Sequence, residues 1–381
     1  MQKEKLVPAI RFKGFSEEWK DIYLSQVASV ITGGEPPKHY SKTFNHKKNF
    51  IYPVYSNGYD ENALWGYADT YKVDKPSITF SSIGTLGFPT IRLEPYTPII
   101  RLKVILPILN QVDLQYLKYA LDQSDFMTNA SGIPNMNADQ VKQIIINSTD
   151  INEQQKIGLF FSGLDSLVRS QEQKLEKLQA IKQSLLNKMF ASYDKKMPEI
   201  RFKGFNEDWN TDKVCNLFKI TRGEVLAQNQ ISEFQNEIYA YPVYSSQTLK
   251  NGLMGYYKEY LFDNCITWTT DGANAGTVKY RNEKFYCTNV CGVLEEGKLK
   301  PNDCFAELLN LVTPNHVTRA GNPKLMNSTM GEIIINYPNS TIEYTKISTL
   351  FMSIDSLIHS CDQKLKKLNN IKQALLEKMF C

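Results

Sequence analysis

The first half of this 381-residue chain lacks cysteine, and all seven cysteines lie in the second half. An odd number distributed in this way argues against a disulfide framework and for a reducing compartment, so we expect a cytoplasmic protein. Cys287 and Cys291 lie four apart in what reads as a single strand, FYCTNVCGV, without a CxxC pair or paired histidines. The sequence therefore favours buried free thiols over zinc, and we expect no metal ligands.

Long apolar runs and catalytic signatures are also missing. No apolar run approaches the roughly 18 residues of a membrane span, and the N-terminus MQKEKLVPAIRF has no signal-peptide core, so we expect no membrane partner. Walker A, GxGxxG, HExxH and the NPPY-like motif of amino-methyltransferases do not occur, and the four histidines are scattered. We expect no catalytic residues. The net charge of +4 permits basic patches without demanding an anionic partner.

What the chain does have is an internal repeat at an offset of 190 residues. Residues 150–190 match 340–380 at 21 of 41 positions, and PAIRFKGFSEEW (Pro8–Trp19) returns as PEIRFKGFNEDW (Pro198–Trp209). Elsewhere the halves agree only in short patches. A long internal period decides the architecture of a chain. Here the repeated segments form a frame that occurs twice, and the divergent segments between them predict two different recognition parts, or readers, held on that frame.

Each repeated segment carries apolar residues at alternating steps of four and three, which is typical of a coiled coil. The candidate seam residues are Leu164, Val168, Leu175, Leu178 and Leu185 in the first segment and Ile354, Ile358, Leu365, Leu368 and Leu375 in the second. At about 1.5 Å per residue each helix is roughly 55–60 Å long. Because the chain leaves along one helix and returns along the other, we expect the helices to pair antiparallel with approximate two-fold symmetry. The layout is then circular, since Met1–Ile10 supplies the segment that the repeat would place after Phe380.

Polar residues interrupt the seam at Gln171, Lys182 and Lys372. Polar seam residues can specify register at a cost in stability. We favour the simpler interpretation, in which the two lysines snorkel outward beside Ile181 and Ile371.

The remaining segments read as strands with irregular loops. YPVYSNG (Tyr52–Gly58) parallels YPVYSSQ (Tyr241–Gln247), and short helices are expected at Leu114–Leu121 and Phe305–Leu311. The sequence therefore predicts an α+β fold. Two mixed α/β domains, residues 1–150 and 192–339, are expected to be joined by long helices in 151–191 and 340–381, which form an antiparallel coiled coil with pseudo-two-fold symmetry.

Two loops at equivalent places in these domains differ in chemistry. The first, within 38–50, mixes basic and aromatic residues, which suits phosphate and base contacts but also suits a solvated loop. The second, within 225–237, has no Lys or Arg and offers amides that can read adenine. Ser/Thr/Gly loops at the exits of two strands could contact phosphate or only turn the chain. The candidate DNA-binding residues are Lys38, His39, Tyr40, Lys42, Lys47, Lys48, Ser82, Thr85, Gln228, Asn229, Gln230, Thr270, Asn274, Lys279 and Arg281.

The chain resembles the specificity subunit of type I restriction-modification enzymes. The resemblance rests on EQQKIGLFFSGLDSLV (Glu153–Val168), the KMF ending (Lys188–Phe190), the RFKGF–W openings, the YPVYS patch and GIPNMN (Gly132–Asn137), and it covers essentially the whole chain. The second helix reads EYTKI at Glu343–Ile347 in place of EQQKI, which leaves the seam intact. The resemblance implies that each domain reads one half of a split double-stranded DNA sequence and that the helices set the unread gap.

The same resemblance implies partner subunits. By this resemblance two methyltransferase subunits would dock on the helices, and restriction-translocase subunits would join them. S-adenosylmethionine, ATP and Mg²⁺ would then belong to the partners, so we expect no cofactor in this chain. Two other interpretations remain open, a coiled-coil scaffold that binds only proteins and an enzyme with an active site hidden in one globular segment.

Overall fold

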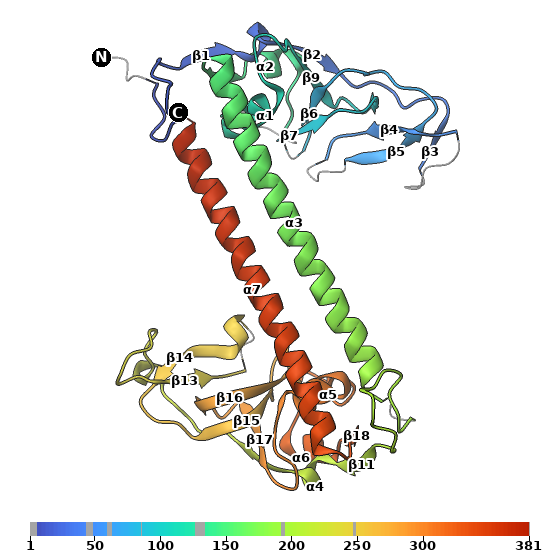
Figure 1. Ribbon diagram of the computed structural model, residues 1–381, viewed down its shortest axis with the longest axis vertical. Helices are drawn as coiled ribbons and strands as arrows, with labels where there is room; N and C mark the ends of the chain where they lie inside the picture. Colours follow the sequence, from blue (N-terminus) through green and yellow to red (C-terminus); the bar gives the residue numbers. More distant parts are fainter. Residues whose placement is uncertain are drawn as a thin grey trace. The chain divides into compact units, whose positions relative to one another are not determined.

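The computed structural model describes residues 6–42, 49–58, 63–84, 86–125, 134–191, 195–246 and 249–380. It divides into two compact units: unit 1 is Met1–Glu172 with Gln363–Cys381, and unit 2 is Gln173–Asp362. Each unit holds one globular part and opposite halves of two 39-residue helices, α3 (Ile151–Met189) and α7 (Thr341–Met379) (Figure 1). The units therefore divide each long helix, whereas the sequence-based partition makes each helix a segment of its own.

The globular part of unit 1 contains two four-stranded sheets. One has the order β2-β9-β6-β7 and is antiparallel throughout, and the other has the order β3-β5-β4-β8 with β4 and β8 parallel. A separate pair, β1 and β10, lies next to the start of α3 in the chain. The strands are β1 (Lys20–Tyr23), β2 (Ala28–Thr32), β3 (Tyr40–Ser41), β4 (Tyr52–Tyr55), β5 (Leu64–Ala68), β6 (Ser77–Ser81), β7 (Gly87–Arg92), β8 (Thr97–Pro98), β9 (Lys103–Pro107) and β10 (Ile145–Ser148); the α-helices are α1 (Leu114–Gln123) and α2 (Ala138–Lys142).

The globular part of unit 2 repeats this plan with two differences. The place of β3 is taken by an isolated bridge between Ser232 and Tyr256. The six-stranded sheet has the order β12-β17-β15-β16-β13-β14, because the ten-residue β16 pairs with β15 and also, in parallel, with β13. One strand thus takes the places of both β7 and β8. The elements are β11 (Asn210–Lys213), α4 (Val214–Leu217), β12 (Phe218–Arg222), β13 (Tyr241–Tyr244), β14 (Leu253–Tyr257), β15 (Phe262–Thr269), β16 (Val278–Cys287), β17 (Cys291–Glu296), α5 (Asp303–Val312), α6 (Asn327–Glu332) and β18 (Ile334–Tyr337). Helices α1 and α5 confirm the two short helices expected from the sequence.

One aromatic cluster in each unit joins the two long helices to the globular part. In unit 1 the ring of Phe380, just after α7, stacks on Tyr116 of α1 with centroids 5.5 Å apart and packs edge-on against Trp19. In unit 2 the ring of Phe190, just after α3, stacks on Phe351 of α7 with centroids 5.7 Å apart. Fully burying such side chains stabilises the fold by roughly 1.5–3 kcal/mol each. The end of one long helix packs near the start of the other in both units, so the helices pair antiparallel.

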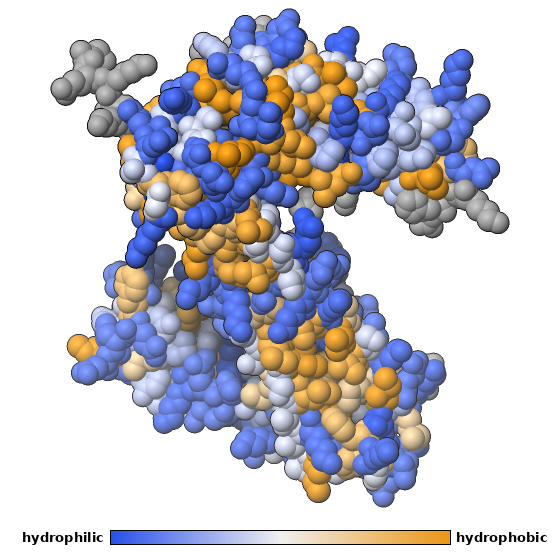
Figure 2. Space-filling view, turned by 45° about the horizontal axis from the view of Figure 1, so that its top comes forward, coloured by the Kyte–Doolittle hydropathy of each residue, from blue (hydrophilic) through white to orange (hydrophobic). Residues whose placement is uncertain are grey.

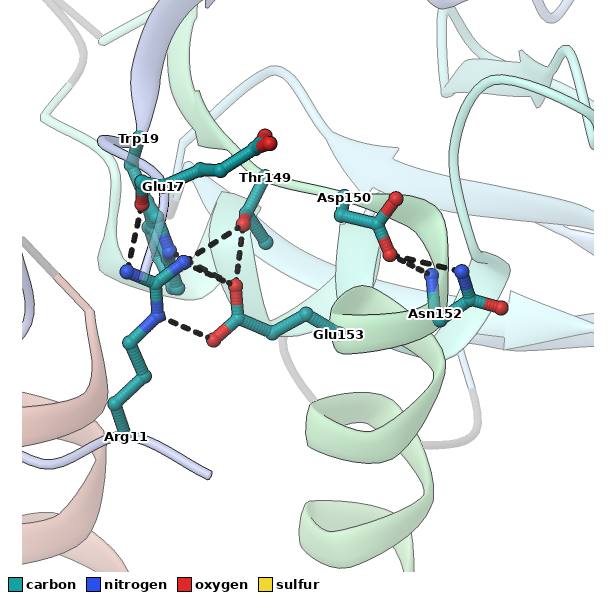
Figure 3. A network of polar contacts seen from close by, with 7 residues as sticks. All are labelled: Arg11, Glu17, Trp19, Thr149, Asp150, Asn152 and Glu153. Carbon is teal, nitrogen blue, oxygen red and sulfur yellow. Dashed lines mark hydrogen bonds and ion pairs between the residues drawn. The ribbon is translucent and has the colours of Figure 1, made fainter. Parts of the chain in front are cut away.

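The same polar joint ties each globular part to the start of a long helix (Figure 3). The guanidinium of Arg11 donates to both oxygens of the buried Glu153 carboxylate, at 2.7 and 2.8 Å, and to the carbonyl of Glu17 at 2.6 Å. Arg201 binds Glu343 in the same way, at 2.5 and 2.8 Å. A bidentate Arg–carboxylate pair fixes geometry as well as charge. The joint therefore sets the angle at which each helix leaves its domain.

The layout of the backbone at the helix ends is circular, as expected. The amide of Ile10 donates to the carbonyl of Lys378 at 2.9 Å, and the amide of Ile200 donates to the carbonyl of Lys188 at the same distance. Ile10 thus contacts the end of α7 in the same way as Ile200 contacts the end of α3.

Burial along the helices follows the seam proposed from the sequence. The seam residues Leu164, Val168, Leu175 and Leu178 are half-buried between exposed neighbours, and Ile354 is buried. The coiled-coil geometry itself stays a prediction. We find that the seam lysines do not snorkel outward, which corrects that expectation.

Ion pairs hold both seam lysines at equivalent positions. Lys182 donates to Glu307 of α5 and to Asp355 of α7, both at 2.6 Å, and Lys372 lies 2.5 Å from Asp165 of α3. Shifting the Lys182–Asp355 pair by the repeat offset gives the Lys372–Asp165 pair. An ammonium that is partly withdrawn from water is destabilising without its carboxylate partner, so a shift of the helices that separates the pair is costly. The lysines therefore specify the register of the two helices.

Within the described parts of the chain, no helix is both long enough and apolar enough to cross a bilayer.

Candidate DNA-recognition surfaces

A glycine follows the strand β2 in the first globular part and the strand β12 in the second, and each glycine packs closely against a turn from later in the chain. The amide of Gly33 donates to the carbonyl of Leu102 at 2.7 Å, and the amide of Gly223 donates to the carbonyl of Cys291 at 3.0 Å. A Cβ on Gly33 would lie 2.8 Å from the Ile99 nitrogen, and one on Gly223 would lie 2.1 Å from the Cys287 carbonyl oxygen. The close approach of two backbones thus requires glycine at the sites where the two candidate loops begin.

The first candidate loop presents basic and aromatic groups together. Lys38, His39, Tyr40 and Lys42 are exposed. The ring of Tyr40 packs against Trp65 with centroids 4.6 Å apart, and the ammonium of Lys42 lies 5.1 Å from the Trp65 centroid. The cation and the aromatic pair therefore form one surface. Lys47 and Lys48 lie outside the described residues.

The second candidate loop is polar but uncharged where the first is basic. Gln228, Asn229 and Gln230 form a single exposed 3₁₀ turn. Phe234 follows with a relative exposure of 77%. The two surfaces, at equivalent places of the repeat, thus offer different contacts, as the sequence predicts.

The strand-exit hydroxyls have another role than the one expected. Ser82 is fully buried, and its hydroxyl donates to the carbonyl of Arg101 at 2.9 Å. Thr270, its equivalent, is 7% exposed and donates to the carbonyl of Val290 at 2.8 Å. A hydroxyl that points inward cannot meet DNA in this conformation, so we place neither residue on the recognition surface. Thr85 lies outside the described residues.

These hydroxyls fix two turns that the sequence analysis did not single out. The turn at 99–102 joins β8 to β9, and the turn at 288–290 joins β16 to β17. The second turn also corrects the expectation that FYCTNVCGV is one strand. Cys287 ends β16 and Cys291 begins β17, and both are buried free thiols.

The remaining candidates lie in the second globular part. Asn274 is exposed in the turn after β15, and Lys279 is exposed on β16. The guanidinium of Arg281 lies 3.6 Å from the Tyr244 centroid and donates to the carbonyl of Asn251 at 2.8 Å. Arg92 lies on Tyr55 at the same 3.6 Å in the first part, so this stacking belongs to the shared frame.

An acidic cluster adjoins Lys279 and Arg281. They line an open cavity of about 550 Å³ together with Asp303, Glu307 and Asp355. The three carboxylates could gather a cation, and the ammonium of Lys182 is the cation that contacts two of them. Burial, together with the charges of Glu307 and Asp355, raises the pKa of Asp303 to about 7. Negative charge here opposes phosphate, so we do not carry Lys279 and Arg281 into the proposals below.

The repeated plan has a counterpart among known families. The family model described as the type I restriction modification DNA specificity domain matches residues 16–180 and again 206–370. The chain belongs to this family. It carries two specificity domains, one in each half of the repeat.

Relatives in Mycoplasma pneumoniae support the assignment. A protein named as the N-terminus of a type I specificity subunit is 40% identical over 143 residues, which are 37% of this chain and 74% of that protein. A second protein named as a type I specificity subunit is 30% identical over 235 residues, 61% of this chain and 82% of its own length. The specificity subunit of the restriction enzyme MpnII is 35% identical over 157 residues, 40% of this chain and 46% of that subunit.

The fold is also that of a solved structure. The S subunit of a type I restriction-modification system from M. genitalium superposes with a TM-score of 0.76 over 99% of both chains, at 16% identity. At that identity the likeness establishes the fold alone. It covers both globular parts and both long helices.

Proposed function

We propose that this chain is the DNA-reading subunit of a type I restriction-modification complex, in which each globular part reads one half of a bipartite sequence. The observation that carries the proposal is a frame repeated in detail around surfaces that differ. The Arg–Glu joint, the helix ion pair and the Gly–turn contact all occur twice. The first loop is basic and aromatic, and the second carries amides. Independent readers on one frame can be exchanged without rebuilding it.

The long helices set the length of the unread gap in this proposal. Each is a single 39-residue helix, about 58 Å long at 1.5 Å per residue. Half-sites on one face of B-DNA lie about 34–36 Å apart, centre to centre, which such helices can span.

The helices also dock the two methyltransferase subunits. Leu167 and Leu357, at equivalent positions, are 56% and 54% exposed, and Ile181 and Ile371 are exposed as well. Apolar patches lie open on the otherwise largely hydrophilic face in Figure 2. Large apolar side chains mark a partner interface where they gather into an exposed patch, whereas single exposed ones are ordinary on any protein surface. The occurrence of these residues as equivalent pairs supports two copies of one partner.

Catalysis then belongs to the partners. Methyltransferase subunits bring S-adenosylmethionine, and restriction-translocase subunits bring ATP and Mg²⁺, while this chain supplies sequence specificity in the cytoplasm. The family assignment and the motifs absent from the sequence support this division.

Mapping methylated bases in cells with and without this chain tests the proposal. Alongside its methyltransferase subunits, the chain should produce one bipartite methylated motif that vanishes when the chain is deleted. Methyl transfer to DNA by the isolated chain would indicate an enzyme instead. A complex that assembles but binds no duplex DNA would indicate a protein scaffold.

A further inference from the structure

The turn between β8 and β9 holds two residues in a backbone conformation that side chains disfavour. Ile100 has φ of 51° and Arg101 has φ of 60°, and the amide of Leu102 donates to the carbonyl of Ile99 at 3.1 Å. Two successive positive φ values with this hydrogen bond are typical of a type I′ turn, which normally takes Asn and Gly. A β-branched residue in this region is an outlier. Strain of this kind persists only where the surroundings enforce it, and it concentrates at functional sites.

Buried polar groups enforce the turn from below. The carbonyl of Arg101 accepts from the hydroxyl of Ser82 at 2.9 Å and from the ammonium of Lys103 at 3.0 Å, and both donors are buried. The side-chain amide of Asn57 donates to the carbonyl of Ile100, and its oxygen accepts from the amide of Ser82 at 2.8 Å. Burial is the main cause that lowers the pKa of Lys103. Burying an ammonium costs free energy, because the charge loses its hydration and gains only one carbonyl as a hydrogen-bond partner. A loop without a function would not require such a support.

The second globular part holds the equivalent turn with hydrogen bonds of the same kind, although neither Asn289 nor Val290 has a positive φ. The amide of Cys291 donates to the carbonyl of Thr288 at 2.9 Å, and the carbonyl of Val290 accepts from the hydroxyl of Thr270 at 2.8 Å. The amides of Ile99 and Thr288 donate to the carbonyls of Tyr55 and Tyr244, each at 2.9 Å. The two turns are therefore equivalent parts of the repeated frame.

What differs is the polar side chain that each turn exposes and its place in the turn, because Asn289 corresponds to Ile100 and Val290 corresponds to Arg101. Arg101 is exposed beside Ile100, which is 50% exposed. Asn289 is exposed and lines an open groove of about 470 Å³ that also includes Arg222 and Asn327. Among the described residues, the guanidinium of Arg101 and the amide of Asn289 have no hydrogen-bond partner. A rigid support thus presents a different polar group in each part.

We propose that Arg101 and Asn289 read base edges in the major groove, Arg101 a guanine in one half-sequence and Asn289 an adenine in the other. This rests on the proposed function and adds the residues that give it specificity. A guanidinium can donate both hydrogen bonds to the O6 and N7 of guanine, and an asparagine amide can pair with the N6 and N7 of adenine. Ser82 and Thr270 act as positioning residues, because each fixes the carbonyl of a tip residue.

Methylation mapping of the complete methyltransferase complex tests this assignment with single substitutions. Arg101→Ala should relax one guanine position in one half-sequence and lower methylation of the original site by about tenfold or more. Arg101→Lys should relax the same position, because lysine keeps the charge without the bidentate geometry. Asn289→Ala should relax one adenine position in the other half only. Lys75→Ala, which removes an exposed charge elsewhere in unit 1, is the matched control and should leave the motif unchanged.

Three results would overturn the inference. An unchanged motif in Arg101→Ala and Asn289→Ala would remove the turns from base reading while leaving the proposed function in place. Equal weakening on every sequence, restored by Arg101→Lys, would make Arg101 a phosphate contact. A wild-type complex that methylates no bipartite motif would overturn the proposed function and this inference with it. Thermal unfolding of each variant, measured beside the wild type, separates loss of reading from loss of folding.

Discussion

Single buried hydroxyls shape the recognition surfaces at the residue scale. Thr270 is a point where three segments meet. Its hydroxyl donates to the carbonyl of Val290, and its carbonyl accepts from the amide of Leu325 at 2.9 Å. Ser82 makes the corresponding contacts, with the amide of Met136 at 2.9 Å. Removing either hydroxyl takes one of two donors from the carbonyl, because the amide of Thr270 also donates to Val290 at 3.2 Å and the ammonium of Lys103 also donates to Arg101 at 3.0 Å. The loss of one such hydrogen bond costs about 0.5–1.5 kcal/mol.

A matched pair of substitutions at Thr270 separates the hydrogen bond from the packing. Thr270→Val keeps the shape and removes the hydroxyl, so we expect about 0.5–1.5 kcal/mol of lost stability and a relaxed second half-sequence. Thr270→Ser keeps the hydroxyl and should retain the motif. Chemical denaturation and methylation mapping provide the two measurements. Equal behaviour of the two variants in both would show that the hydroxyl does not position the turn.

Asp303 makes stability depend on pH. Its pKa is about 7 in the folded chain because of burial and then of the like charges of Glu307 and Asp355, with Lys182 and Lys279 opposing the shift. Between about pH 4 and 7 the folded state therefore binds more protons than the unfolded state, so this group's contribution to stability falls as pH rises through that window. Asp303→Asn should stabilise the chain by about 1–2 kcal/mol at pH 8 and by little at pH 5.

Denaturant unfolding at both pH values measures this difference. Glu233→Gln removes an exposed charge from the same unit and serves as the control, with little change expected at either pH. A gain from Asp303→Asn that is the same at pH 5 and pH 8 would contradict the assigned pKa shift.

The sequence pattern identified the turns around the candidate recognition surfaces, but it did not show which side chains are exposed there. The Gly turns and the Ser/Thr strand exits were identifiable, because small residues mark places where backbones approach closely. Whether Ser82 faces outward or inward depends on the fold around it. Ile100 and Arg101 carry none of the Asn–Gly signal of a type I′ turn, since tertiary contacts and not local preference hold them there. Asn289 was hidden in an apolar run that reads as one strand.

The long helices are the elements that the sequence predicts best. Sustained heptad spacing and the absence of proline allow little else, and the observed bounds, Ile151–Met189 and Thr341–Met379, fall inside the expected segments. Lys182 and Lys372 were misread, because their carboxylate partners lie on other elements. One helix carries Lys182 and Asp165, and the other carries Lys372 and Asp355, so each unit receives one ion pair. Register is therefore specified separately in each unit.

An insertion between the two ion pairs tests the helices as the spacer. Four residues added to α3 between Leu178 and Ile181 lengthen it by about 6 Å and leave both lysine contacts within their units. A coiled coil can absorb such an insertion by local unwinding. We expect the unread gap to grow by about one to two base pairs, at roughly 3.4 Å each, with both half-sequences unchanged. Replacing residues 178–181 with another four-residue segment of the same pattern is the control.

Methylation mapping decides the outcome. An active complex with an unchanged gap would mean that the helices do not set the spacing.

At the scale of the whole molecule, the chain is one frame used twice. The joint at Arg11 and Glu153, the aromatic cluster at Phe380 and the Gly33 contact each have a counterpart in the second half, and both matched family regions include a globular part and a helix. Each unit has its own core, built from its globular part and helix ends. Because the cores are separate, one reader can change while the other keeps its surroundings.

Exchange of one reader measures this independence most directly. Residues 12–150 are replaced with the corresponding segment of a relative that has a different motif, so that Arg11 and Glu153 are kept as the joint. The chimaera is expressed with the methyltransferase subunits, and methylated bases are mapped across a genome. The account predicts that one half of the motif changes to that of the donor, while the other half and the gap stay the same. A simultaneous change in both halves would contradict two independent readers on a shared frame.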